Sequence, residues 1–116
     1  MITGIGIDFI EVKRIRDLAE KSPRFLEKIF TPREIAYCSK KRYKYQNFAA
    51  RFAAKEAFFK AIGKRLHWKN VELVNLPSGK PRLEMKAGQK WPFTKAHVSV
   101  THLAEHAMAV VILEKT

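Results

Sequence analysis

A carboxylate stands beside two glycines near the start of the chain. In "GIGIDF", residues 4–9, apolar residues alternate first with glycine and then with Asp8, a pattern that predicts a β-strand. Gly4, Gly6 and Asp8 therefore share one face. A carboxylate so placed can bind a hard cation, with the glycines leaving room for a phosphate or a metal-bound water. It can also cap the helix expected a few residues later, and this stretch by itself favours that capping role over metal binding. The opposite face is expected to join the core and carries Ile5, Ile7 and Phe9.

A second carboxylate lies in a long apolar stretch, "QNFAARFAAKEAFFKAIG", whose periodicity predicts a largely buried helix that ends at Gly63. Glu56 stands one turn before Lys60. A buried carboxylate is costly unless it is paired or bound to a metal, so Glu56 is either a metal ligand or one half of an ion pair with Lys60. Arg51 and Lys55 repeat the same spacing with like charges. An anion between them would relieve their repulsion, unless both side chains extend to water.

Two histidines fall in "HVSVTH", residues 97–102, which alternates like a strand. His102 starts the turn that follows. A histidine at this place can act as a base or bind phosphate, and the alternative is a histidine that serves only the core or the turn. Neither a zinc site nor a hydrolase triad is indicated, because His97 and His102 lack a cysteine partner and no orienting acid is placed by the sequence.

The net charge of +12, from 23 Lys and Arg against 11 acids, indicates an anionic partner. The run "KKRYKYQNF" interleaves basic residues with aromatic ones and is compatible with stacking on bases. A basic nucleic-acid-binding module without catalytic activity is therefore the alternative function. The run can also be a solvated linker whose aromatic side chains pack inward, and no nucleic-acid-binding motif accompanies it.

The order of elements predicts one α+β domain over residues 1–116. An N-terminal strand over residues 2–9 is followed by helices, including the long buried one, and then by antiparallel strands. "TPRE", residues 31–34, is a helix start with Thr31 as N-cap and Glu34 closing a capping box. The C-terminal strands are expected at residues 71–74, 82–86, 97–102 and 107–114.

Cysteine usage and hydropathy predict a cytoplasmic protein. Cys38 is the only cysteine, which rules out an intramolecular disulfide and suits a reducing compartment. No basic or long apolar segment precedes the first strand, so no secretory signal is expected. The longest apolar run, residues 107–113, is too short to span a bilayer, and no membrane partner is expected.

Taken together and in this order, the motifs resemble those of one family. They are "GIGID" near the N-terminus, "RFAAKEAFFKAIG" at 51–63, "GKP" at 79–81, and "HVSVTH" followed by "AMAVVILE". The combination resembles the holo-acyl-carrier-protein synthases, the small bacterial 4'-phosphopantetheinyl transferases, over almost the whole chain. The resemblance implies the fold of that family and the transfer of 4'-phosphopantetheine from coenzyme A to a serine of apo acyl carrier protein. Adenosine 3',5'-bisphosphate would be released, and the reaction would serve fatty acid biosynthesis.

The resemblance also implies roles for single residues. Asp8 and Glu56 match the ligands of a catalytic Mg²⁺, and the glycines before Asp8 would leave space for the metal, its waters and a pyrophosphate. Lys60 would stabilise the charge that develops during transfer. His102 is a possible base or a contact to coenzyme A, with a metal-bound water as the other candidate base. Coenzyme A contacts are expected from Arg51, Gly79, Lys80, Pro81 and His102.

The family's docking surface for the acidic carrier protein lies on its first helical region. The matching residues are Arg14, Leu18, Arg24 and Phe25. Both arginines are expected on the polar side, away from the metal ligands. A homotrimer with active sites between subunits is also expected, partly from the family and partly because so small a chain must assemble several sites around one small core. Nucleic acid is not an expected partner.

The chain departs from the family pattern in four places. Ala50 stands where a glycine is usual, Phe59 replaces a common serine, and Leu103 follows His102 where a small hydroxyl residue is common. Lys64 and Arg65 follow Gly63 where threonine and glycine are usual. None of these is a matched metal ligand, but the last departure bears on where the phosphates lie.

Overall fold

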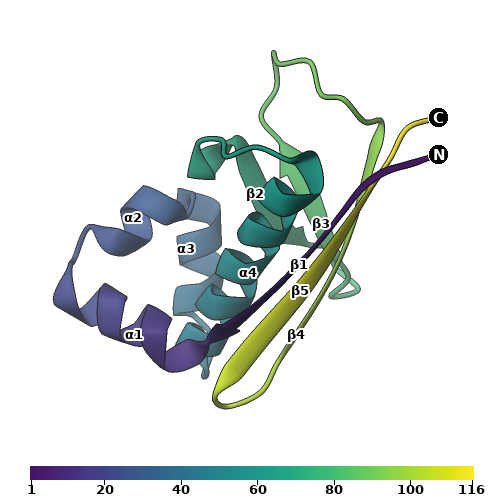
Figure 1. Ribbon diagram of the computed structural model, residues 1–116. Helices are drawn as coiled ribbons and strands as arrows, with labels where there is room; N and C mark the ends of the chain where they lie inside the picture. Colours follow the sequence, from purple (N-terminus) through teal and green to yellow (C-terminus); the bar gives the residue numbers. More distant parts are fainter.

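The computed structural model describes residues 1–116, and it confirms the α+β class. Its main sheet is antiparallel, with the strand order β1–β5–β4. A separate hairpin pairs β2 with β3. The strands are β1 (Ile2–Glu11), β2 (Val71–Asn75), β3 (Pro81–Met85), β4 (Lys95–His102) and β5 (His106–Glu114). The first strand thus pairs with the last, and the two chain ends lie together (Figure 1).

The helices are α1 (Val12–Lys21), α2 (Phe25–Ile29), α3 (Pro32–Ser39) and α4 (Lys44–Ile62), followed by a 3-10 turn, η1 (Trp68–Asn70). Local signals mark the start of α3 and the end of α4, whereas α1, α2 and α4 begin without a side-chain cap. The capping box of α3 is confirmed: Thr31 Oγ1 accepts from the Glu34 N–H, and Glu34 Oε1 accepts from the Thr31 N–H. Gly63 ends α4 in the left-handed region, at φ 84°. None of the helices combines the length and apolar character needed to cross a bilayer.

Helix α4 is the centre of the molecule, between the main sheet and the shorter helices (Figure 1). Its small side chains, Ala49, Ala50, Ala53, Ala54, Ala57 and Ala61, are buried. The predicted buried helix is therefore confirmed. The glycines of β1 face this helix: a Cβ atom on Gly4 would lie 2.0 Å from the Ala61 carbonyl oxygen. The expectation that the glycines leave space for a metal and a pyrophosphate is wrong, because the α4 backbone fills that space.

The burial of the opposite face of β1 also differs from the sequence prediction. Ile5, Ile7 and Phe9 were expected in the core, but they are 66%, 57% and 65% exposed. Since only the glycine face can approach α4 closely, the bulkier residues must point away from the helix. The outer face of the sheet is thus apolar and uncovered in the single chain, with Met108 of β5 beside Phe9.

A buried ion pair ties the shorter helices to α4. Lys55 Nζ lies 2.7 Å from Glu34 Oε1, and both side chains are fully buried. Lys55 also donates to the carbonyl oxygens of Ile29 and Trp68, and Glu34 Oε2 accepts from the Leu73 N–H. Burial lowers the pKa of Lys55, and the Glu34 carboxylate opposes that change. Lys55 therefore neither shares an anion with Arg51 nor extends to water.

Candidate active site

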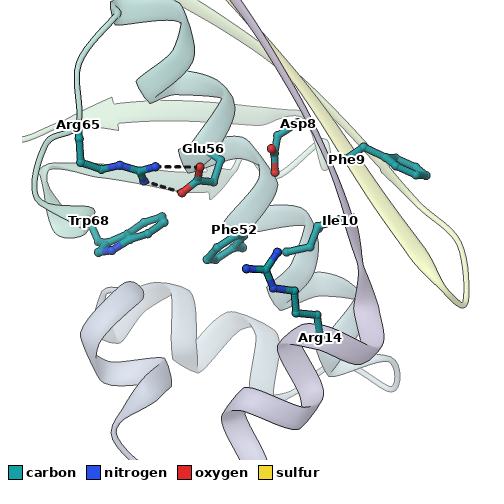
Figure 2. A pocket seen from close by; sticks show the side chains of 8 residues that line it. All are labelled: Asp8, Phe9, Ile10, Arg14, Phe52, Glu56, Arg65 and Trp68. Atoms are coloured by element: carbon teal, nitrogen blue, oxygen red, sulfur yellow. Dashed lines mark hydrogen bonds and ion pairs between the residues drawn. The ribbon is translucent and has the colours of Figure 1, made fainter.

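Asp8 of β1 and Glu56 of α4 line one cavity of about 440 Å³. Figure 2 shows both carboxylates directed into it. The side chains are 15% and 17% exposed, so each is largely desolvated but reachable from solvent. The remaining lining residues are Phe9, Ile10, Arg14, Phe52, Arg65 and Trp68. The two residues share a site because the glycine face of β1 packs directly on α4.

Each carboxylate is paired with a cation. Lys60 Nζ lies 3.1 Å from Asp8 Oδ1 and also donates to the Ile7 carbonyl oxygen at 3.0 Å. Arg65 donates to both oxygens of Glu56, at 2.6 and 3.2 Å. Two alternatives from the sequence are therefore wrong. Asp8 does not cap α1, whose N-cap residue is Glu11, and Lys60 pairs with Asp8 across the strand–helix contact instead of with Glu56.

The donor set fits a hard divalent cation. Mg²⁺ is commonly bound by one or two carboxylates, with water and substrate phosphates supplying the other ligands. Asp8 and Glu56 supply two carboxylates to one cavity, and the cavity leaves room for further oxygen ligands. No third acidic, histidine or cysteine side chain joins them in a complete protein cage. The arrangement suits a metal shared with a phosphorylated ligand better than a structural metal.

Arg65 is the residue of this site that the sequence reasoning did not assign. Its guanidinium stands nine residues beyond Glu56, where the turn at Gly63 brings the chain back toward α4. The hydrogen bond to Glu56 raises the pKa of Arg65. A signal was present in the sequence: a basic residue shortly after a glycine-capped helix can fold back onto the last turns of that helix.

The four expected docking residues lie on and beside a basic groove between α1 and α2. Leu18, Arg24 and Phe25 line this groove, which has a volume of about 760 Å³. Its other lining residues are Lys21, Ser22, Glu27, Lys28 and Lys69. Arg14 does not line this groove and instead lines the cavity of Asp8 and Glu56. The expectation that Arg14 lies away from the matched metal ligands is therefore wrong.

The residues matched to coenzyme A contacts form a second group, outside the cavity. Arg51 is buried and donates to the Asn75 side chain, whose amide in turn donates to the Gly79 carbonyl oxygen at 3.0 Å. Asn75, which the sequence analysis passed over, thus joins Arg51 to the Gly79-Lys80-Pro81 turn. Arg51 and Glu56 are five residues apart on α4 and so project from different faces of the helix.

Neither histidine of β4 lines the cavity. His102 is on the inner face of the sheet and hydrogen-bonds through Nδ1 to Gln46 Oε1 at 2.8 Å. Strand β5 separates it from β1. His97 lies on the outer face, 3.0 Å from Glu114, and the hydrogen bond from His97 lowers the pKa of Glu114. Within one chain, His102 is not brought to Asp8 and Glu56.

The basic run after α3 is divided between a turn and a helix, because α4 begins at Lys44 and so includes the second half of the run. Phe48 is fully buried and Tyr45 packs against the core, so only Tyr43 is exposed among the aromatic residues of the run. The guanidinium of Arg42 lies over the Tyr43 ring, and the ammonium of Lys44 lies over the Tyr45 ring. One face of the Tyr43 ring and one face of the Tyr45 ring are therefore already covered by cations of the same chain.

The model of the 4'-phosphopantetheinyl transferase superfamily matches residues 4–111. The chain belongs to this family. A holo-acyl-carrier-protein synthase from Geotalea daltonii is 41% identical to it over 125 residues, which cover 99% of this chain and 100% of the relative. The match includes Asp8 in the first strand, the helix with Glu56 and Lys60, and β4 with most of β5.

Solved structures of the same family have the same fold. The holo-acyl-carrier-protein synthase from Bacillus anthracis, solved in complex with CoA (3',5'-ADP), is 36% identical with a TM-score of 0.84, covering 100% of this chain and 99% of that chain. The enzyme from Helicobacter pylori, solved in complex with coenzyme A, is 29% identical with a TM-score of 0.83, covering 95% and 99%. The fold expected from the sequence motifs is thereby confirmed.

Proposed function

We propose that this protein transfers 4'-phosphopantetheine from coenzyme A to a serine of apo acyl carrier protein, as a holo-acyl-carrier-protein synthase. The observation that carries the proposal is the placement of Asp8 and Glu56 on one cavity, with Lys60 paired to Asp8, in a member of this transferase family. The serine oxygen would form a bond to the pantetheine-side phosphorus of the pyrophosphate. The bond to the bridging oxygen would break, and adenosine 3',5'-bisphosphate would leave.

The cavity residues hold the charges that this reaction needs. Asp8 and Glu56 would hold Mg²⁺, which when bound neutralises phosphoryl charge and orients the phosphates for in-line attack. Lys60 is fixed by the Ile7 carbonyl oxygen and Asp8, so its ammonium stands beside a carboxylate of the cavity before any ligand arrives. A cation placed in advance stabilises charge on the phosphoryl oxygens and on the leaving group without reorganisation.

Within one chain, the residues matched to coenzyme A contacts are separated from the cavity of Asp8 and Glu56. This separation favours an assembly of several subunits. Arg51 with the Gly79-Lys80-Pro81 turn, and His102, lie outside the cavity of Asp8 and Glu56 in the single chain. A homotrimer with active sites between subunits would place these groups of one subunit beside the cavity of the next. The uncovered apolar face of the main sheet supports such a contact, since exposed apolar patches of this kind mark interfaces. In this arrangement His102 is a coenzyme A contact or the base for the serine proton.

The groove between α1 and α2 is the proposed docking site for the carrier protein. Its lining carries four cations against the single acid Glu27, and it exposes the apolar side chain of Leu18. An acidic carrier would be steered to it by charge and held by apolar contact. Arg14 lies between this groove and the cavity, so it can contact a carrier whose serine reaches the phosphates.

The same proposal includes the domain organisation and the cellular location of the protein. We place the whole activity in one domain over residues 1–116. The only cysteine, Cys38, is buried and unpaired, which fits a reducing compartment and supports a cytoplasmic location. The product would be a holo carrier protein for fatty acid biosynthesis.

Chromatographic detection of adenosine 3',5'-bisphosphate tests the proposed reaction. Release from coenzyme A should require apo acyl carrier protein and Mg²⁺, and a carrier whose serine is replaced by alanine should give none. Random duplex DNA serves as the comparison ligand, because a basic nucleic-acid-binding module would bind it with strong salt dependence. Tight DNA binding without nucleotide release would overturn the proposal in favour of that alternative.

A further inference from the structure

Arg65 is held at the cavity by two kinds of contact. Beyond its bonds to Glu56, its guanidinium carbon lies 5.1 Å from the ring centroid of Phe59 and 5.3 Å from that of Trp68. The two rings pack edge to face, 5.4 Å apart, and so form a firm aromatic support. Such cation–π contacts would keep the guanidinium at the cavity even without its carboxylate partner.

The pairing with Glu56 cannot persist unchanged when that carboxylate binds a cation. Arg65 engages both oxygens of Glu56, and these are the atoms that would ligate a metal. The guanidinium also brings a positive charge to the position where a divalent cation would bind. Arg65 and the metal therefore compete for Glu56.

The guanidinium donates to no acceptor in the chain other than Glu56. The Arg65 side chain is 60% exposed. A planar guanidinium matches the oxygen geometry of a phosphate and can bind it with two hydrogen bonds. The aromatic support leaves its edge free to face the cavity.

We propose that Arg65 acts first as the counter-ion of Glu56 and then, when the metal takes Glu56, as a binding residue for phosphate oxygens of coenzyme A. This inference rests on the proposed function. It gives Arg65 two opposite effects: it weakens metal binding in the absence of coenzyme A and strengthens coenzyme A binding in the presence of metal. A residue that merely neutralised Glu56 would produce the first effect alone.

Binding measurements on Arg65→Ala separate the two effects. Mn²⁺ binding is measured by electron paramagnetic resonance without coenzyme A, and coenzyme A binding by calorimetry at saturating Mn²⁺. The variant should bind Mn²⁺ about two- to five-fold more tightly, the range for an ion pair in which one partner is exposed. It should bind coenzyme A about ten-fold more weakly, as expected for lost charge-assisted hydrogen bonds.

Two further variants control for charge and geometry. Lys90→Ala removes the same charge from an exposed residue of the β3–β4 connection, which forms no ion pair, and should leave both affinities near the wild-type values. Arg65→Lys keeps the charge but loses the planar fork, so coenzyme A binding should fall between wild type and Arg65→Ala.

The outcomes distinguish this inference from the proposed function. Wild-type binding of both ligands, with either affinity unchanged in Arg65→Ala, would overturn the role of Arg65 alone. Weaker Mn²⁺ binding in the variant would also overturn it, because Arg65 would then be shaping the site instead of competing for it. A wild-type protein that binds neither ligand would overturn the inference together with the proposed function.

Discussion

A Cβ atom on Gly6 would lie 1.9 Å from the carbonyl oxygen of Ala57. No side chain tolerates such a contact with backbone, so glycine is required for β1 to reach α4. Asp8 follows on the same face of the strand, and Glu56 precedes Ala57 in the helix. The close contact between strand and helix is therefore what brings the two carboxylates to one cavity.

Replacing Gly6 should damage stability and activity together. Gly6→Ala forces β1 away from α4, and we expect a loss of about 1–3 kcal/mol or more in the free energy of unfolding, as for an overpacked core. Urea denaturation measures it. Thr3→Ala, on the same strand, removes one long hydrogen bond of 3.4 Å and should change stability little. A Gly6→Ala protein as stable as wild type would show that the strand–helix contact is not tight in solution.

The outer face of the main sheet should hold the oligomer together. Ile7→Glu places a charge on an exposed apolar face and should convert a trimer to monomers, as measured by light scattering. Leu103→Glu is the matched control, because Leu103 is 74% exposed but lies in the turn between β4 and β5. It should remain trimeric. A wild-type protein that is monomeric and fully active would refute the trimer.

Charge reversal in the α1–α2 groove should weaken carrier recognition selectively. Arg24 is a cleaner probe than Arg14, since Arg14 also lines the cavity. Arg24→Glu should raise the KM for the carrier protein several-fold and leave the KM for coenzyme A nearly unchanged, with the difference fading at high salt. Lys86→Glu, remote on the β3–β4 connection, should change neither. The docking assignment fails if Arg24→Glu affects coenzyme A instead.

Cys38 should make stability fall at alkaline pH. Burial raises the pKa of its thiol from an ordinary 9.0 to about 12. Between these values the unfolded chain loses a proton that the folded chain keeps, so the free energy of unfolding falls as pH rises from 9, by at most about 1.4 kcal/mol per unit. Urea denaturation from pH 8 to 10.5 should show a shallower decline in Cys38→Ala. Equal slopes would contradict the buried, protonated thiol.

Local signals in the sequence predict the start of α3 and the end of α4, but they do not predict which face of β1 is buried. The Thr31 capping box and the Gly63 terminus depend on a few neighbouring residues, and both were predicted. The burial of β1 depends on what packs against it. Apolar Ile5 and Ile7 suggested the core side, whereas the glycines mark the side that contacts α4.

Long-range pairings were also beyond the sequence pattern. Asp8 and Glu56 were brought together by the family resemblance, and their common cavity depends on β1 lying beside α4. Arg65 reaches Glu56 only because the chain turns back after Gly63, and Asn75 reaches Arg51 only through tertiary packing. Periodicity describes one element at a time, so it does not identify such partners.

Mass spectrometry of apo acyl carrier protein, after incubation with this protein, coenzyme A and Mg²⁺, tests the central claim most directly. Wild type should add one 4'-phosphopantetheine group to a single serine. Glu56→Gln and Asp8→Asn, which keep side-chain size but remove a ligand charge, should reduce the rate at least about 100-fold while remaining folded. Glu20→Gln, at an exposed position of α1, should behave as wild type. An unmodified carrier with wild-type protein, or full modification by both cavity variants, would contradict the account.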